Sequence, residues 1–187
     1  FAAVRKELNE SLIERDEEVS LLLTALLAGE HVLLIGPPGC GKSLLIDSIM
    51  RWLHCSKFSC LLNRYSIPEE ILGQYSLSEL KADRFVRITN GKLPEAQVAF
   101  LDEIFRASPS ILNVLLKILN EKTFDRGDGV HRRVPLELCV AAANDYPQGD
   151  EAKSLGALVD RFMLRKSVAP ISSAAGRQKL LWNNQPP

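Results

Sequence analysis

The sequence predicts an α/β protein whose parallel sheet is covered by helices on both faces. Short apolar runs of strand length alternate along the chain with segments of helical periodicity, and this alternation favours a parallel sheet. A glycine-rich stretch, GPPGCGKS at 36–43, stands between one such run and the helical segment that follows. The chain has 187 residues, 46% of them apolar, which is enough for one domain with a full core.

The first half of the chain begins with apolar residues at helical spacing over 8–29. They predict an amphipathic helix that can break near Asp16 and that ends at Gly29. The next predicted elements are a buried strand over 31–35, a helix apolar on all sides over 43–54, a strand over 57–66, a short helix over 68–73, and a hairpin formed by FVRIT at 85–89 with NGK at 90–92.

The second half contains a third strand, over 98–103, and then the clearest helix of the chain, over 108–124. Ser108 can cap this helix, and Pro109 occupies its first position. The remaining predicted elements are a second hairpin over 124–136 that turns at 127–129, a strand over 138–144, a short helix over 155–162 and a last strand over 163–171.

The stretch GPPGCGKS fits the phosphate-binding pattern G-x-x-x-x-G-K-S/T. Glycines let backbone N–H groups turn toward phosphates, the lysine supplies positive charge, and the serine supplies an oxygen for Mg²⁺. We therefore predict a site for a nucleoside triphosphate; the alternative is a glycine-rich turn without a ligand. The residues expected to contact the nucleotide are Gly36, Pro37, Pro38, Gly39, Cys40, Gly41, Lys42, Ser43 and Leu44.

Two acids end the predicted strand over 98–103. Asp102 can hold hydrated Mg²⁺ together with Ser43, and Glu103, which faces another way, can polarise a water toward the γ-phosphate. Solvated loop charges are the alternative for such a pair. Asn144 ends the strand over 138–144, where it could hydrogen-bond the γ-phosphate and the attacking water; a turn-forming asparagine is the alternative.

An arginine lies just before the last predicted strand. Arg161 could reach the γ-phosphate of a neighbouring subunit and stabilise charge in the transition state, as an arginine finger does. A surface ion pair with Asp160 is the alternative. The expected catalytic set is Lys42, Asp102, Glu103, Asn144 and Arg161.

The composition narrows the classes of partner. The formal net charge is zero, with acids and bases interspersed, which disfavours nucleic acid and a membrane surface. No apolar run approaches the roughly 20 residues that span a bilayer, and the first residues do not form a secretory signal, so a cytoplasmic setting is expected. The four cysteines lack the spacing of a disulfide or zinc motif, so reduced thiols are expected.

Four motifs in this order, GPPGCGKS, VAFLDE, AAAN and DRF, resemble the core of an AAA+ ATPase. Residues 93–124 resemble the MoxR family, and the pairing of residues 65–80 with 90–96 is similar to its RavA (regulatory ATPase variant A) branch. The resemblance covers nearly the whole chain. It implies a three-layer P-loop NTPase fold of the AAA+ type, with a five-stranded parallel sheet and two hairpin inserts.

The resemblance also implies an activity and partners. Members of the family form hexameric rings that bind ATP and Mg²⁺ between adjacent subunits and hydrolyse the ATP, which would place Arg161 in trans. They act as chaperone-like remodelling ATPases on protein clients, often beside partners with a von Willebrand factor A domain. The inserts over 76–92 and 124–135 are candidates for carrying nucleotide-driven motion to a substrate; plain surface hairpins are the alternative.

The sequence departs from the family pattern near its C-terminal end, where 172–187 are too few residues for the expected helical lid. We therefore expect residues 1–187 to be the large nucleotide-binding subdomain without its lid. Residues 14–31 resemble the segment that packs beside the base in the family, which makes Arg15 and Val19 candidates for adenine contact.

Other functions are compatible with a phosphate loop, because kinases, switches and motors share it. A small-molecule kinase would need a lid with arginines and an acceptor site, and it would not need Glu103 beside Asp102. A scaffold whose ring shape is set by nucleotide, with incidental hydrolysis, is a second alternative. A nucleic-acid motor is the third, and the zero net charge disfavours it.

Overall fold

The computed structural model describes residues 2–182, except for the side chains of residues 150, 151 and 154. A five-stranded parallel sheet with the strand order β2-β3-β6-β1-β7 forms its centre. The strands are β1 Val32–Ile35, β2 Lys57–Leu61, β3 Val98–Asp102, β6 Leu138–Ala143 and β7 Leu164–Ser167. The predicted α/β class and its five parallel strands are confirmed.

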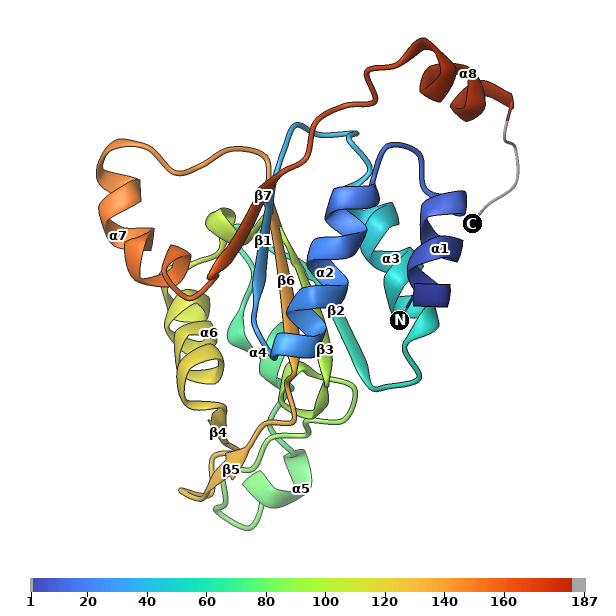
Figure 1. Ribbon diagram of the computed structural model, residues 1–187. Helices are drawn as coiled ribbons and strands as arrows, with labels where there is room; N and C mark the ends of the chain where they lie inside the picture. The colour runs from blue at the N-terminus through green and yellow to red at the C-terminus, as the bar shows by residue number, and fades with distance from the viewer. Residues whose placement is uncertain (1, 183–187) are drawn as a thin grey trace.

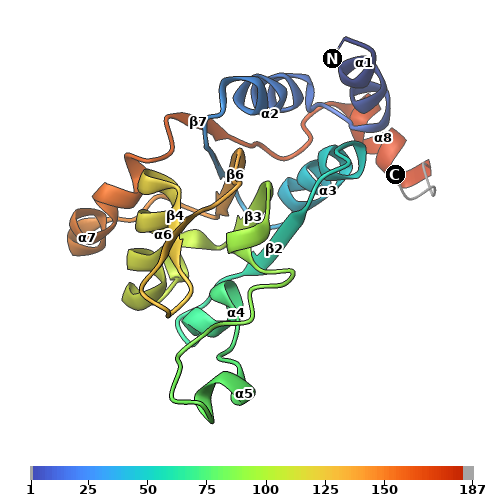
Figure 2. The same ribbon diagram turned by 90° about the horizontal axis from the view of Figure 1, so that it is seen from below.

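Helices cover both faces of the sheet, as Figure 1 and Figure 2 show. One face carries α1 Ala2–Ser11, α2 Asp16–Ala28 and α3 Lys42–Trp52, and the other carries α4 Pro68–Leu72, α6 Pro109–Glu121 and α7 Gly149–Val159. The helix α8 Ala174–Trp182 follows the last strand. The predicted three-layer arrangement is therefore present.

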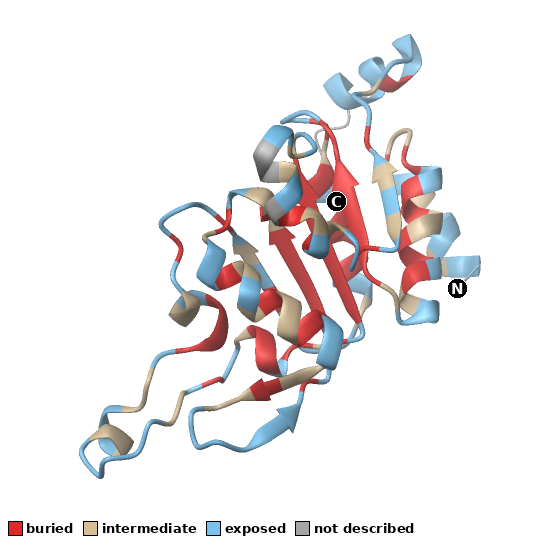
Figure 3. Cartoon of the chain, turned by 90° about the vertical axis from the view of Figure 1, so that its left-hand side faces the viewer, coloured by how far each residue is buried: buried red, intermediate tan, exposed pale blue. Residues whose placement is uncertain are grey.

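The core is divided into two clusters by the sheet, because successive side chains of a strand point to opposite faces. In β1, Leu33 and Ile35 pack in the cluster under α4, α6 and α7, whereas Val32 and Leu34 pack in the cluster under α1, α2 and α3. Figure 3 shows the central strands as buried throughout. Burial on both faces explains why these strands appear in the sequence as continuous apolar runs.

The predicted helix over 8–29 is two helices in the structure, and the break lies at residues 12–15, close to the expected position. Glu14 has φ +54°, in the left-handed region, and Arg15 stands at the N-cap of α2 with non-helical torsions. The second helix ends as expected at Gly29, whose φ of +69° closes the last turn.

Two strands are shorter than predicted. The strand predicted over 57–66 ends at Leu61 because Asn63 starts a turn, in which its side-chain oxygen accepts a hydrogen bond from the Tyr65 N–H at 2.8 Å. The strand predicted over 163–171 ends at Ser167, before Pro170, which cannot donate a ladder hydrogen bond. The predicted helix over 155–162 begins earlier, as α7.

The residue before α6 takes the predicted position but makes different hydrogen bonds. Ser108 is the N-cap and Pro109 is the first helical residue, as expected. The Ser108 hydroxyl, however, contacts the Ser66 carbonyl at 3.4 Å and the Ser110 hydroxyl at 2.9 Å, and it caps no backbone N–H of the helix. It therefore connects α6 to the loop before α4.

The first insert does not form the hairpin predicted between residues 85–89 and 90–92. Residues 74–76 pair instead with 86–88, through an isolated antiparallel bridge between Tyr75 and Arg87, and the short helix α5 Leu77–Leu80 closes the loop. Residues after Gly91 enter the 3-10 turn Leu93–Glu95. Residues 90–92 form a turn and not the second arm of a hairpin.

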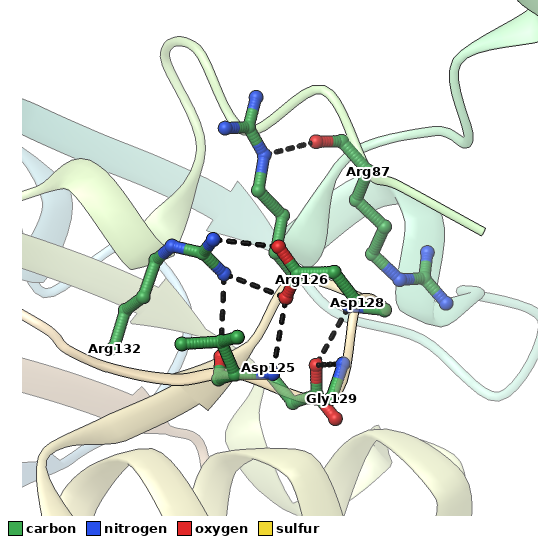
Figure 4. Close-up of polar contacts among 8 residues, drawn as sticks. Arg87, Asp125, Arg126, Asp128, Gly129 and Arg132 are labelled. Carbon is green, nitrogen blue, oxygen red and sulfur yellow. Dashed lines mark hydrogen bonds and ion pairs between the residues drawn. The ribbon is translucent and has the colours of Figure 1, made fainter. Parts of the chain in front are cut away.

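The second insert is the predicted hairpin, made of β4 Thr123–Asp125 and β5 His131–Arg133. It is hydrogen-bonded to the first insert. The Arg87 N–H donates to the Arg126 carbonyl at 2.8 Å, and the Arg126 Nε–H donates to the Arg87 carbonyl at 2.6 Å. Figure 4 shows this contact beside the ion pair of Arg132 with Asp128 at the hairpin tip, 2.6 Å long. The two inserts thus form one peripheral unit.

Candidate functional site

The predicted nucleotide site lies at the edge of the sheet where the parallel strands end. β1 leads into Gly36, β3 ends in Asp102, and β6 is followed by Asn144. These strands are neighbours, so the residues that follow them converge. A cavity of about 320 Å³ is lined there by Pro38, Gly39, Cys40, Gly41, Lys42, Ser43, Leu44, Asp102, Glu103 and Asn144.

The loop conformation explains the glycines of GPPGCGKS. Gly39 and Gly41 have φ values of +79° and +84°, which side-chain-bearing residues rarely adopt. A Cβ atom on Gly36 would lie 2.2 Å from the Val168 carbonyl oxygen, so only glycine fits where the loop leaves the sheet. Gly41 is the N-cap of α3, and the positive end of that helix dipole therefore faces the loop.

Lys42 has the geometry expected of a phosphate-binding lysine. Its side chain is buried, and its ammonium donates to the carbonyls of Gly36 at 2.5 Å and Pro37 at 3.2 Å and to the Asn144 side-chain oxygen at 3.3 Å. All of these acceptors are neutral, and they do not compensate the positive charge. A buried cation with neutral partners favours an anionic ligand in this cavity.

Glu103 occupies a strained backbone position next to this lysine. Its φ is +53°, in the left-handed region, and its N–H donates to the Asp102 carboxylate at 3.0 Å. Its carboxylate accepts a hydrogen bond from the Asn144 amide at 2.5 Å and pairs with Arg106 Nε at 3.3 Å. Strain of this kind is concentrated at functional sites. Both Glu103 and Asp102 line the cavity, and the prediction that their side chains face different ways stays a prediction.

Two oxygen-bearing side chains of the cavity suit Mg²⁺. Ser43 and Asp102 both line it, and hydroxyl and carboxylate oxygens are hard ligands that this ion accepts. Among the described residues there is no group of three or more His, Cys, Asp or Glu side chains arranged to hold a metal. A serine hydroxyl and one carboxylate fit an ion that is completed by phosphate oxygens and water, as Mg²⁺ commonly is.

Arg161 is not brought to this cavity. It is exposed in the turn between α7 and β7, and the register pairs the start of β7 with Val32 at the start of β1. It therefore lies at the opposite edge of the sheet from Gly36. The alternative ion pair with Asp160 is not formed, because Asp160 pairs with Arg165 at 3.8 Å.

The two candidates for adenine contact have other roles in the structure. Val19 is fully buried in the core cluster under α2. Arg15 is also buried, and its guanidinium donates to the carbonyls of Cys40 at 2.6 Å and Ala169 at 2.9 Å. Core packing and backbone hydrogen bonds thus occupy both side chains, and the prediction of adenine contact is not supported.

A residue that the sequence analysis did not single out lies next to the acid pair. Arg106, three residues after Glu103, pairs with its carboxylate. Both residues also line a larger cavity of about 870 Å³, together with Asn63, Arg64, Tyr65, Phe105, Ala143, Asn144, Asp145, Tyr146, Pro147 and Gln148. The sequence signal that could have identified Arg106 is its spacing of three residues from Glu103, which allows an ion pair across one turn.

The cysteines are free thiols in the structure. Burial raises the pKa of the Cys139 thiol to about 12, so it is not a nucleophile near neutral pH. Cys40 is buried in the phosphate loop, and Cys55 and Cys60 are partly exposed. None of the helices in residues 2–182 is both long and apolar enough to cross a membrane.

Comparison with known proteins identifies the family. A family model for the MoxR domain in MoxR–vWA–β-propeller ternary systems matches residues 1–183. Two uncharacterized proteins of Methanocaldococcus jannaschii are each 44% identical over 179 residues, which is 95% of this chain and 47% and 46% of theirs. Protein MoxR of Methylorubrum extorquens is 25% identical over 187 residues, 97% of this chain and 53% of that protein.

The chain spans about half the length of the curated relatives that it matches. A crystal structure of a candidate ATPase from Cytophaga hutchinsonii has the same fold, with a TM-score of 0.75 over 96% of this chain and 53% of that one, at 20% identity. The family match covers nearly all described residues, including the phosphate loop and the acid pair. The chain therefore belongs to the MoxR family of AAA+ ATPases.

Proposed function

We propose that this chain binds Mg-ATP at the phosphate loop and hydrolyses it to ADP and phosphate. One observation carries the proposal. A single cavity is lined by the loop, by the buried ammonium of Lys42, by the acid pair Asp102 and Glu103 and by Asn144. Binding alone would require the loop, the lysine and the Mg²⁺ ligands Ser43 and Asp102. Glu103 and Asn144 add what hydrolysis requires.

Each side chain has a role that follows from its position. Lys42 would exchange its carbonyl contacts for phosphate oxygens and stabilise their negative charge. Asn144, which already contacts Lys42 and Glu103, would hold the attacking water in line with the γ-phosphate. Glu103 would accept a proton from that water as its oxygen bonds to the γ-phosphorus, while the bond to the β-phosphate oxygen breaks and ADP leaves.

Mg²⁺, which arrives with the nucleotide, would be held by Ser43 and Asp102 and would neutralise charge on the phosphate oxygens. Ser43 and Asp102 have this role for the same reason, because each offers an oxygen ligand that Mg²⁺ accepts. Neither of them needs to transfer a proton in the reaction proposed here. Replacing Ser43 or Asp102 should therefore make ATP binding less dependent on Mg²⁺. It should have a smaller effect on proton transfer from the attacking water.

We further propose that residues 1–187 are the large nucleotide-binding subdomain of a homo-hexameric ring and that a helical lid is not part of them. The position of Arg161 supports an action in trans, because it is exposed and lies at the opposite edge of the sheet from the loop of its own subunit. In a closed ring the same surface of every subunit would meet the site of the next one.

The ring would remodel a protein client. The match to MoxR domains of MoxR–vWA–β-propeller systems supports a partner with a von Willebrand factor A domain. The interlocked inserts are the candidate elements for transmitting motion to the client. The narrower likeness to the RavA branch and the cytoplasmic setting stay predictions, and with zero net charge a nucleic-acid partner remains disfavoured.

The decisive experiment replaces Glu103 by Gln, which keeps the hydrogen bond from Asn144 but cannot accept a proton. Mg-ATP affinity, measured by calorimetry, should stay close to that of the wild type, while the hydrolysis rate should fall by about a hundredfold or more. If the variant hydrolyses ATP at the wild-type rate, the role of Glu103 is wrong. If ATP binding and the output of the partner both persist without hydrolysis, the chain acts as a nucleotide-dependent scaffold.

A further inference from the structure

Arg15 is a buried cation, and two of the three groups that it contacts are far from it in sequence. It is 6% exposed, in the turn between α1 and α2. Its guanidinium donates to the carbonyls of Glu14 at 2.6 Å, Cys40 at 2.6 Å and Ala169 at 2.9 Å. Buried arginines are normally paired with acids or hydrogen-bonded in full. Here the hydrogen bonds go to backbone carbonyls of three separate segments.

These three segments meet beside the nucleotide site. Figure 1 shows the α1–α2 connection, the β1–α3 loop and the segment after β7 at the same end of the sheet. Cys40 belongs to the phosphate loop, and Ala169 lies just after Val168, whose carbonyl approaches Gly36. Arg15 therefore connects the loop to the rigid end of the sheet.

The hydrogen bond to Cys40 has a consequence for the next amide. In a trans peptide, the carbonyl and the following N–H point in opposite directions. Arg15 holds the Cys40 carbonyl, so the Gly41 N–H points away from the Arg15 guanidinium. Cys40 and Gly41 both line the nucleotide cavity. Gly41 has φ +84° and little steric restraint, so without a tether this peptide could rotate.

The turn that carries Arg15 is itself anchored. The Glu14 carboxylate accepts hydrogen bonds from the backbone N–H groups of Ser172 at 2.9 Å and Ser173 at 3.1 Å. Hydrogen bonds from Ser173 and Ser172 lower the pKa of Glu14 to about 2, so the carboxylate stays ionised at all ordinary pH values. Glu14 thus ties the turn to the segment after β7 but does not contact the phosphate loop.

We propose that Arg15 is a positioning residue for the phosphate loop, which fixes the Cys40–Gly41 peptide with its N–H toward the triphosphate and thereby sets nucleotide affinity. The inference rests on the proposed function, because it requires nucleotide at the loop. It predicts that a residue without contact to the ligand changes affinity through the backbone. A planar guanidinium suits this role, because its N–H donors lie in a rigid fork that can meet several carbonyls at once.

The test compares Arg15→Met, Arg15→Lys and the matched control Glu14→Gln with the wild type, by calorimetry with Mg-ATP. Arg15→Met should raise the Kd by about tenfold or more, the range expected for lost hydrogen bonds to a charged group. The Kd of Arg15→Lys should lie between those of the wild type and Arg15→Met, because a single ammonium replaces the forked guanidinium. Glu14→Gln weakens the same turn and should lower the unfolding temperature while leaving the Kd close to that of the wild type.

Chemical rescue separates positioning from general destabilisation. With an Arg15→Ala variant, millimolar methylguanidinium should restore much of the Mg-ATP affinity, whereas methylammonium should not. If Arg15→Met does not fold, Arg15→Lys decides, since wild-type affinity in that variant overturns the inference and weakened affinity supports it.

The outcomes separate the inference from the function on which it rests. Equal affinities for Arg15→Met and the wild type, or an equal loss in Glu14→Gln, would overturn the inference alone. A wild type that binds no Mg-ATP would overturn the proposed function and this inference with it.

Discussion

Lys42 shows how one residue can serve the site both with and without its ligand. Its ammonium is held by the carbonyls of Gly36 and Pro37 and by Asn144, all of which belong to the cavity. Since these groups are neutral, phosphate oxygens are stronger acceptors for the same ammonium. The lysine is therefore placed where nucleotide binding would draw it away from the loop carbonyls, with little change in backbone.

We expect Lys42→Ala to lose Mg-ATP binding almost entirely, because the side chains that line the cavity then supply no positive charge to the phosphates. The unfolding temperature without nucleotide should change little, since the lysine binds neutral groups only. Calorimetry with Mg-ATP tests the first statement and thermal melts the second. Lys81→Ala, which removes an exposed lysine of the first insert, is the control. Tight Mg-ATP binding by Lys42→Ala would mean that the site is misassigned.

His31 makes stability depend on pH. Burial, and secondly the positive charge of Lys122, lower the pKa of His31 to about 4 from an ordinary value of 6.5. Its Nδ1 accepts a hydrogen bond from the Cys139 N–H at 3.2 Å, which requires the neutral ring. Below pH 6.5 the unfolded chain takes up the proton first, so stability should fall between pH 6.5 and 4, by on the order of 3 kcal/mol.

The check is chemical unfolding of the wild type and of His31→Asn from pH 8 to pH 4. Asn keeps an oxygen acceptor for the Cys139 N–H but does not titrate. The difference in unfolding free energy between the two proteins should be constant above pH 6.5 and should shift in favour of the variant as the pH falls. Parallel curves throughout that range would show that His31 does not carry the dependence.

The residues of the site differ in how far sequence could place them. Spacing within GPPGCGKS and the strand before Asp102 were sufficient, because parallel strands bring their carboxyl ends together. The contact of Arg15 with Ala169 spans 154 positions of the chain, and no local pattern encodes it. Arg15 was predicted to contact adenine because residues 14–31 resemble the family segment that packs beside the base. In the structure its side chain is buried and donates to backbone carbonyls.

Among the elements, the first insert departed furthest from its prediction. An Asn-Gly pair is a strong hairpin signal, and a turn does form there, with the Lys92 N–H donating to the Thr89 carbonyl at 3.0 Å. The chain then leads into a proline-containing 3-10 turn, so the expected partner strand is absent from the residues described there. Residues 86–88 pair with residues 74–76 instead, and tertiary contact with the second insert sets this pairing. The buried strands could be predicted from their apolar composition alone, without knowledge of a tertiary contact.

Gly127 of the second insert lies close to the backbone of the first insert. A Cβ atom on it would lie 2.1 Å from the Phe85 carbonyl oxygen, and its φ is +105°. We expect Gly127→Ala to separate the inserts and to break the hydrogen bond from the Arg87 N–H to the Arg126 carbonyl. Hydrogen exchange of the Arg87 amide should become faster, while the core strands keep their protection.

Gly129→Ala is the matched control for this prediction. Gly129 lies in the same turn with φ +76°, but a Cβ there would meet no atom within 4 Å. It therefore isolates the backbone cost of a positive φ, about 1 kcal/mol, from the collision with the first insert. Equal amide exchange in the two alanine variants would mean that the inserts are not held together by this contact.

For the whole molecule, the separation of Arg161 from the phosphate loop is the main feature that one subunit leaves unexplained. The cavity contains its lysine, acids and asparagine, but the exposed arginine lies at the far edge of the sheet. An arginine finger in trans predicts that specific ATPase activity rises with protein concentration as subunits associate. Arg161→Ala should bind Mg-ATP with wild-type affinity and lower turnover by about a thousandfold.

Mixing two inactive variants tests this arrangement directly. Arg161→Ala keeps Glu103, and Glu103→Gln keeps Arg161, so a ring that contains both has some interfaces in which every catalytic group is intact. If Arg161 acts in trans, the mixture should regain a measurable fraction of wild-type activity, although each variant alone is inactive. If it acts within its own subunit, no interface is repaired and the mixture stays inactive. Size-exclusion chromatography of the mixture must show co-assembly, because only then does a lack of ATPase activity count against the action of Arg161 in trans.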